Sequence, residues 1–441
     1  KKNFNNYLGV NSTFKKNKLE WKANFNYNRL NPWESHSIDY QIQNAAIASK
    51  YDVSAVTKRK QYNFGGGLFY KINDDDYFSF NINARLRDDT FPINTFTYNK
   101  NQDQENNVLT QSENSSKKNF VNSFLNYSKK IKAINTQLFA GFQYSNFQQT
   151  LLTMVENNYN ETAFNLAQNR KQDFNVDVFS GRIDLEKKFK NEMSLEYGGL
   201  YSAAKSKSDT NIFDFERNEN TALYYDFKEQ NTAAYTQLSG KIKKISFSAG
   251  LRAENTNVIG KYKTDFSPLI HKNYTNVFPK VQFSMAVDST KNISLNYAKS
   301  ISRPNYSSLS NIATYINPYF IYAGNINLGP AFVDEISSTF QYHDKSVKLS
   351  LYQVKKPVYN SFLFDKERNI MTFKDINFDK ETGLNVDFEL PFTYKFWTTT
   401  NSVIFILEKV QDPSADFLKS KPYLYYYSNN EFKLPKDYTF V

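Results

Sequence analysis

Apolar and polar residues alternate over about a dozen positions in several stretches of this chain, and that alternation is what most limits its fold. In the segment Tyr77 to Arg87 the apolar parity holds Phe78, Phe80, Ile82, Ala84 and Leu86, and the polar parity holds Ser79, Asn81, Asn83, Arg85 and Arg87. Successive side chains of a strand point to opposite faces, so one face is apolar and the other polar. A tilted strand of about 9–11 residues crosses a bilayer with its apolar groups toward lipid and its polar groups toward a wet lumen. The pattern indicates a transmembrane β-barrel.

The same alternation recurs along the chain, for example in Trp21 to Asn28, Val281 to Val287 and Leu384 to Leu390. Short polar turns, such as Asn73 to Asp76, alternate with longer polar connections. The longest of these connections are Asn31 to Arg59, Asp89 to Lys117 and Pro304 to Phe332. Short turns on one side and long loops on the other are typical of outer-membrane barrels. We therefore predict an all-β, antiparallel, up-and-down barrel with about eighteen strands in this chain, the last one cut short.

Composition agrees with a barrel and argues against other classes. The mean hydropathy is -0.65, yet 17% of the residues are aromatic, as expected where half of each strand is polar and aromatic girdles mark the interfaces. No run approaches the ~18 apolar residues of a helical membrane span. A soluble β-sandwich or propeller is the main alternative. Its strands usually have ~5–6 residues, about half the length of these segments.

The chain has a net charge of +11, which raises nucleic-acid binding as an alternative. Many of the lysines lie in predicted turns, as in Lys129-Lys130, Lys187-Lys188 and Lys243-Lys244. Lysines in these places are better explained as markers of the membrane edge that meet anionic head groups or lipopolysaccharide phosphates. We expect outer-membrane lipid and lipopolysaccharide as partners, and no nucleic acid.

Residues for catalysis or metal binding form no recognisable pattern. His36, His271 and His343 are far apart and lie in predicted loops or turns, and cysteine is absent. No metal-ligand spacing results, although a catalytic triad cannot be judged from spacing. We expect no enzyme activity and no cofactor.

Charged residues on the lumen parity form a first candidate set. Arg85, Arg87, Asp387 and Glu389 belong to it by alternation. Asp177, Asp184 and Glu186 are less certain members, because the parity slips between Val178 and Leu185 and a bulge at Ser180-Gly181 would explain the slip. These side chains either line a solvated wall or contact an internal plug domain, since a wide barrel leaves a lumen to be filled.

A family resemblance lies between Tyr297 and Pro330. The segment Tyr297-Ala-Lys-Ser-Ile-Ser-Arg303-Pro304 is followed by an aromatic loop and by Gly324-Asn-Ile-Asn-Leu-Gly-Pro330. It resembles the signature of the outer-membrane β-barrel family of TonB-dependent receptors, in which Tyr-x-x-Ser-x-x-Arg-Pro leads to Gly-Asn-Pro-x-Leu-x-Pro-Glu. This chain departs from that signature at Ile326 and Ala331.

The resemblance implies that residues 1–441 are the barrel portion of a receptor of about 22 strands. It also implies that an internal plug and the final strands lie outside this sequence. Such receptors import a bulky nutrient, such as a siderophore, a glycan or a peptide, and take energy from a TonB-type protein. A surface lipoprotein or another outer-membrane subunit is a further possible partner. The alternative is a barrel that does not transport and acts as a scaffold or accessory subunit in protein secretion or barrel assembly, since fold does not fix function.

The Arg-Pro junction also has a meaning independent of the family. Pro304 cannot donate to a ladder and so ends a strand, which places Arg303 at the outer rim, where it can bind loop carbonyls or an anionic group. The aromatic residues that follow it either fold the loop over the mouth or meet a ligand. The candidate mouth residues are Arg303, Tyr306, Tyr315, Tyr319 and Tyr322.

Overall fold

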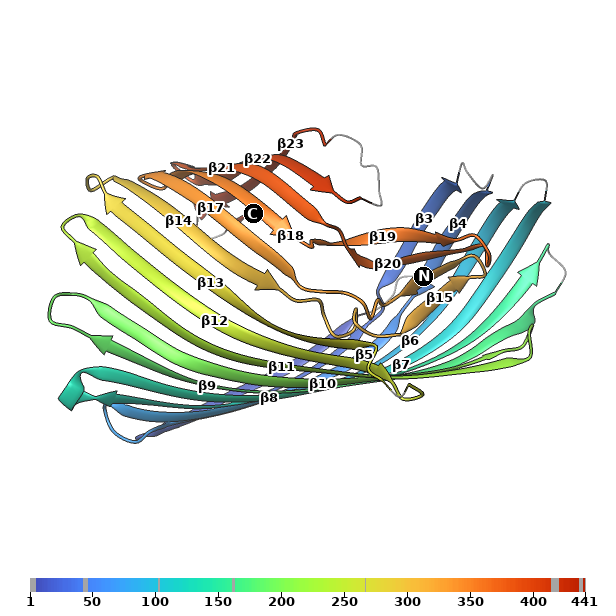
Figure 1. Ribbon diagram of the computed structural model, residues 1–441, viewed down its shortest axis with the longest axis horizontal. Coiled ribbons are helices and arrows are strands. Elements are labelled where there is room, and N and C mark those ends of the chain that lie inside the picture. Colours follow the sequence, from blue (N-terminus) through green and yellow to red (C-terminus); the bar gives the residue numbers. More distant parts are fainter. Residues whose placement is uncertain are drawn as a thin grey trace.

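One large curved sheet forms the wall of the molecule (Figure 1). The computed structural model describes residues 5–42, 47–101, 104–160, 163–265, 267–413, 420–435 and 439–440. Within them, 20 strands make the wall sheet and four make a small inner sheet. All pairings in the wall are antiparallel. No helix in the described part of the chain is long and apolar enough to cross a membrane.

The wall strands follow one another in chain order. They are β1 (Asn6–Lys16), β2 (Leu19–Leu30), β3 (Trp33–Ile42), β4 (Ile47–Val56), β5 (Lys58–Lys71), β6 (Asp76–Asn101), β7 (Gln104–Ile131), β8 (Thr136–Tyr159), β9 (Asn165–Lys188), β10 (Ser194–Asp214), β11 (Glu219–Ile242), β12 (Ile245–Tyr262), β13 (Ile270–Ala286), β14 (Lys291–Ser302), β17 (Ala331–Tyr342), β18 (Lys345–Lys355), β21 (Lys380–Tyr394), β22 (Trp397–Gln411), β23 (Tyr423–Lys433) and β24 (Thr439–Phe440). A short 3-10 helix, η2 (Lys132–Ile134), lies in the turn between β7 and β8.

Two strands of the wall are each divided into two segments, so that β3 continues β2 and β5 continues β4. β2 pairs with β5, and β3 pairs with β4. The Thr57 amide donates to the Pro32 carbonyl at 2.9 Å and links the two ladders. Counting β2 with β3 and β4 with β5 as single wall strands gives 20 − 2 = 18, which agrees with the predicted number. Among the described residues, β1 pairs only with β2, and β24 only with β23.

The two faces of the wall are identified most clearly on β6. Past Asp88, the side chains that share the parity of Asn81 and Asn83 are buried or half-buried. One of them, Ile93, packs against the inner sheet. That parity therefore faces the lumen. Ile82 has the opposite parity and is 39% exposed on the outer face. The alternation predicted from the sequence is confirmed.

The longest predicted loops contain paired strand instead. The described residues between Asp89 and Lys117 are extensions of β6 and β7, whose ladder continues to Asn101 and Gln104. The segment Asn31 to Arg59 contains the β3–β4 hairpin. The apolar-polar alternation fails in these extensions because polar side chains, such as Ser112, are buried on the lumen face.

The bulge predicted between Val178 and Leu185 is also wrong. β9 pairs with β8 and with β10 without a register shift through this segment. Phe174 and Val176 are buried on the lumen face, whereas Ile183 is exposed on the outer face. The strand keeps its alternation. Its apolar residues change faces because the upper lumen has an apolar core and the lower outer face meets lipid.

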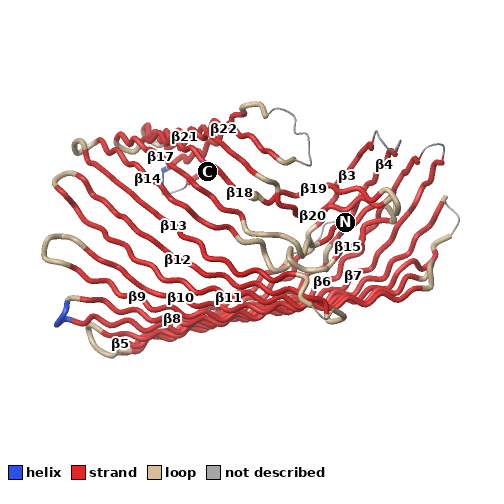
Figure 2. The backbone as a smooth tube through the Cα atoms, viewed as in Figure 1, coloured by secondary structure: helices blue, strands red, loops and turns tan. Residues whose placement is uncertain are grey.

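The inner sheet is built from two long loops and lies inside the wall toward its outer end (Figure 2). The loop between β14 and β17 supplies β15 (Ala313–Asn317) and β16 (Phe320–Ala323), and the loop between β18 and β21 supplies β19 (Val358–Asp365) and β20 (Ile370–Asn377). β16 pairs with β20 in parallel. Phe320, fully buried, packs with Met371 against Tyr51 and Ile93 of the wall.

Several short turns hold a residue other than glycine in the left-handed region. These residues include Asn17, Asn135, Glu192, Lys243, His343 and Lys395. Asparagine tolerates this conformation, but a lysine or glutamate in it is strained by its Cβ. The geometry fits the tight connections expected at the inner end of a barrel.

Candidate ligand site at the lumen mouth

Arg303 follows directly after the last residue of β14, where Pro304 ends the ladder. Its guanidinium forms an ion pair with the buried carboxylate of Glu254 on β12. It also donates to the side-chain oxygens of Asn231 and Thr256, each at 3.3 Å. These partners lie on β11 and β12, which are separated from β14 by β13, so Arg303 ties the start of the loop to the wall on that side.

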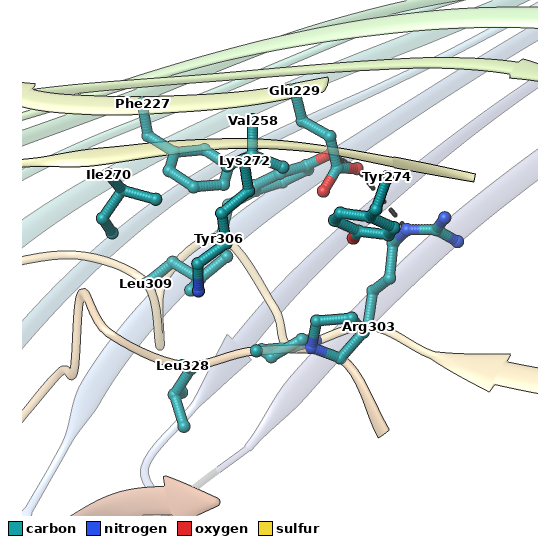
Figure 3. A pocket seen from close by; sticks show the side chains of 13 residues that line it. Phe227, Glu229, Val258, Ile270, Lys272, Tyr274, Arg303, Tyr306, Leu309 and Leu328 are labelled. Carbon is teal, nitrogen blue, oxygen red and sulfur yellow. Dashed lines mark hydrogen bonds and ion pairs between the residues drawn. The ribbon is translucent and has the colours of Figure 1, made fainter. Parts of the chain in front are cut away.

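A second contact reinforces this tie. The Tyr306 hydroxyl donates to Glu229 Oε1 at 3.4 Å, and Arg303 Nε lies 3.8 Å from the same oxygen. Figure 3 shows Arg303 and Glu229 facing each other beside Tyr274. Burial raises the pKa of the Tyr306 phenol, and the Glu229 charge raises it further, so the hydroxyl stays protonated and can donate.

Apolar side chains complete the packing around this contact. Leu309 and Leu328 of the loop meet Phe227, Val258 and Ile270 of the wall. They leave a cavity of about 50 Å³, which has room for a water molecule or two but for no bulky solute. By their contacts Arg303 and Tyr306 anchor the loop, and a ligand role for them stays a prediction.

The other candidate tyrosines lie on or next to the inner sheet. Tyr315 is buried against Val155 and Ala167, and its hydroxyl accepts from Asn157 Nδ2 at 3.3 Å. Tyr322 packs edge-on against Phe373, with ring centroids 5.3 Å apart. Tyr319, half-buried, precedes β16, and its carbonyl accepts from the Met371 amide at 2.8 Å. The structure thus places Tyr315 on β15 and Tyr322 on β16 of the inner sheet, with Tyr319 in the turn between these strands, and all three lie apart from the contact that Arg303 makes.

The lumen charges separate into two groups. Arg85 and Arg87 lie on the lumen face of β6. Arg85 stands over the Phe120 ring at 5.6 Å, and Arg87 Nε donates to Asp89 Oδ2 at 2.7 Å. Asp387 and Glu389 lie on the lumen face of β21, a different part of the wall. Asp387 is opposite Lys348 of β18 in the ladder.

The charges on β9 divide between the two faces. Asp184 and Glu186 share the parity of the buried Phe174 and face the lumen. Asp177 has the other parity and faces outward, where it accepts from the Tyr144 hydroxyl at 2.9 Å. The lumen position suggested for Asp177 is therefore wrong, because that position depended on the bulge that the strand does not have.

Several polar residues of the lumen escaped the sequence interpretation. Arg59, Lys118, Glu229 and Glu254 all lie on the lumen parity of their strands. Arg59 falls in a segment predicted as a loop, and the other three lie in segments whose parity was not assigned from the sequence. The buried Arg170 donates to the Ala313 carbonyl at 3.0 Å and supports the inner sheet from β9. Within the described ranges, no group of three or more metal-ligating side chains is positioned to hold a metal ion.

Solved structures of outer-membrane receptors share this fold at low sequence identity. The siderophore receptor PiuA from Acinetobacter baumannii has a TM-score of 0.57 and 10% identity, over 97% of this chain and 69% of that chain. The alcaligin outer-membrane receptor FauA from Bordetella pertussis has a TM-score of 0.52 and 10% identity, over 98% and 66%. The ferripyoverdine receptor of Pseudomonas aeruginosa has a TM-score of 0.53 and 12% identity, over 98% and 59%. The chain thus spans 59–69% of the length of these three receptors.

The sequence comparison agrees with the fold. No curated protein sequence matches the chain, but a sequence profile of the outer membrane protein beta-barrel family matches residues 129–441. That range includes the Arg-Pro junction and the loop that carried the resemblance noted above. The wall described here is therefore an outer-membrane barrel wall, and the chain belongs to the outer membrane protein beta-barrel family.

Proposed function

We propose that this chain is the barrel of a TonB-dependent receptor-like importer that carries a bulky nutrient, such as a siderophore, a glycan or a peptide, across the outer membrane. The observation that carries this proposal is the mouth. Two loops form one sheet inside a wall of 18 strands, a number that in porins leaves an aqueous channel. A passive pore does not need an ordered sheet packed across its entrance, whereas a receptor that holds its ligand does.

The lower lumen supports the proposal. On β8 to β12, Arg182, Asp184, Glu186 and Arg252 line a hollow of about 600 Å³ in the wall. Arg182 Nε lies 3.2 Å from Asp184 Oδ2. A charged surface of this kind suits polar contacts with an internal plug, through which a TonB-type protein would transmit energy from the inner membrane.

Uptake by cells tests the proposal. The full protein is expressed in cells with and without the TonB-type protein, and growth is followed with siderophores, glycans or peptides as the limiting nutrient. We expect growth on at least one of these nutrients to require both the protein and the energising partner. Growth that needs the protein but not the partner would refute energised import.

A scaffold or accessory subunit remains the second candidate, because the outer face of the strand extensions carries apolar side chains. Phe96 on β6, and Leu152 and Met154 on β8, are 41–47% exposed there, above the level at which the outer face of β6 becomes polar at Asp88. Exposed apolar side chains above the membrane are a feature of protein-binding surfaces.

Purification in a mild detergent followed by mass spectrometry distinguishes the two candidates. An importer is expected to be recovered alone or with one surface lipoprotein, and a scaffold with a fixed set of outer-membrane subunits. Substituting Leu152 by serine tests the same surface directly. The variant should release the partners of a scaffold, whereas the nutrient uptake of an importer should stay unchanged.

A further inference from the structure

Three adjacent strands bring a cluster of cations to the upper lumen. Arg59 of β5 is opposite Asp89 of β6, and Arg87 of β6 is opposite Lys118 of β7. The side chains at these positions point into the lumen, because Asp89 has the parity of the buried Ile93. On the outer face of the same strands, Asp88 and Lys117 are exposed, so the cluster lies just beyond the outer edge of the apolar band.

One carboxylate serves two of the cations. Asp89, 3% exposed, accepts from Arg59 Nε at 3.0 Å and from Arg87 Nε at 2.7 Å. Burial alone would raise the pKa of Asp89, but the hydrogen bonds from Arg87 and Arg59 outweigh it and lower the pKa. Asp89 is therefore ionised, and its charge is shared between the two arginines.

Lys118 has no such partner. Among the described residues, no carboxylate lies within ion-pair distance of its ammonium group. Glu34, the other acid near the cluster, has a side chain that is 76% exposed and lies 3.7 Å from His36. Three cations against one buried carboxylate leave an excess of positive charge, and in a low-dielectric site such an excess is costly without an anion.

The excess charge faces a cavity. A space of about 340 Å³ lies between these wall strands and the inner sheet, with Thr314, Ile316 and Tyr322 on its other side. This volume is within the range of small-molecule sites, and apolar walls with a few convergent polar groups are typical of such sites. Guanidinium groups recognise planar carboxylate and phosphate oxygens especially well.

We propose that this cavity binds a small solute through a carboxylate or phosphate group, held by Arg59, Arg87 and Lys118. The identification of this solute with the imported cargo rests on the proposed function, whereas the binding site does not. The apolar side of the cavity, from Val53 and Ile93, would meet the rest of the solute.

Isothermal titration of the detergent-solubilised protein with inorganic phosphate and with citrate tests the site. We expect at least one of the two anions to bind, with an affinity that falls at least about tenfold in Lys118→Gln and is largely kept in Lys118→Arg. Lys117→Gln is the matched control, because Lys117 is the next residue on the same strand and points outward. It should bind as the unaltered protein does.

The opposite outcomes are equally clear. Absence of binding of both anions would overturn the proposal, as would equal weakening by Lys117→Gln and Lys118→Gln. Titration needs no energising partner, so the two proposals can fail separately. Energised uptake without anion binding would contradict only the site, and anion binding without energised uptake would contradict only the importer.

Discussion

Replacing Ile82 by arginine tests which face of the wall meets lipid. On β6 the outer face is apolar from Phe78 to Leu86 and becomes polar at Asp88. Eight residue steps of about 3.3 Å cover about 26 Å of strand, or about 20 Å of membrane depth at a tilt of about 40°. Ile82 is the middle of this run and therefore lies near the centre of the bilayer.

The expected effect follows from that position. Arginine on the lipid face at mid-bilayer costs about 2–4 kcal/mol in such barrels, whereas Asn83→Arg places the same group in the wet lumen and should cost less than about 1 kcal/mol. The measurement is a urea titration of each variant folded into lipid vesicles, with folding followed by gel mobility. Equal losses in the two variants, or a greater loss from Asn83→Arg, would refute the assignment of faces.

Three further predictions concern the loop anchor, a turn and pH. Glu254→Gln removes the closer of the two carboxylates that pair with Arg303 and leaves only Glu229, so it should destabilise the loop by about 2 kcal/mol. The loss is seen as faster protease cleavage between residues 303 and 330 while the strands stay resistant; unchanged cleavage would contradict the anchor. Lys243→Gly relieves the left-handed conformation at φ 56° and should stabilise the barrel by up to about 1 kcal/mol in the same urea titration, whereas a loss of stability would show that the strain is absent. The lowered pKa of Asp89 means that its ion pairs stabilise the folded state above the usual carboxyl pKa and that this stability is lost as the pH falls through the lower folded value. The advantage over Asp89→Asn should therefore be constant from pH 7 to about 4 and shrink below that; an advantage that grew on acidification would contradict this sign.

The sequence was sufficient to predict the strands within the membrane, because there each strand has lipid on one side and water on the other. Phe80 and Ile82 against Asn81 and Asn83 needed no tertiary information. The same logic failed above the membrane, where the lumen side of β7 buries Ser112 and the outer side meets water. With both faces partly polar, a strand cannot be distinguished from a loop by alternation.

The candidate site could be predicted only in part for a similar reason. Pro304 marked the end of β14 and so located Arg303 at the rim. Its partners Glu229 and Glu254 are 74 and 49 residues away in the chain, and only the register of β11 and β12 places them beside it. The cluster around Lys118 likewise depends on the pairing of three strands, and the predicted loop Asp89 to Lys117 had cut short two of them, β6 and β7.

The parallel pairing of β16 with β20 has a mechanical consequence for the mouth. Because each loop supplies strands to a single sheet, neither loop can swing aside while the other stays in place without breaking that ladder. We expect the two segments to move as one rigid flap, fixed on one side by Arg303 and on another by the packing of Phe320 against Tyr51. Shortening the β19–β20 hairpin should consequently disorder β15 and β16 as well, so that hydrogen exchange in one loop reports on the integrity of the other.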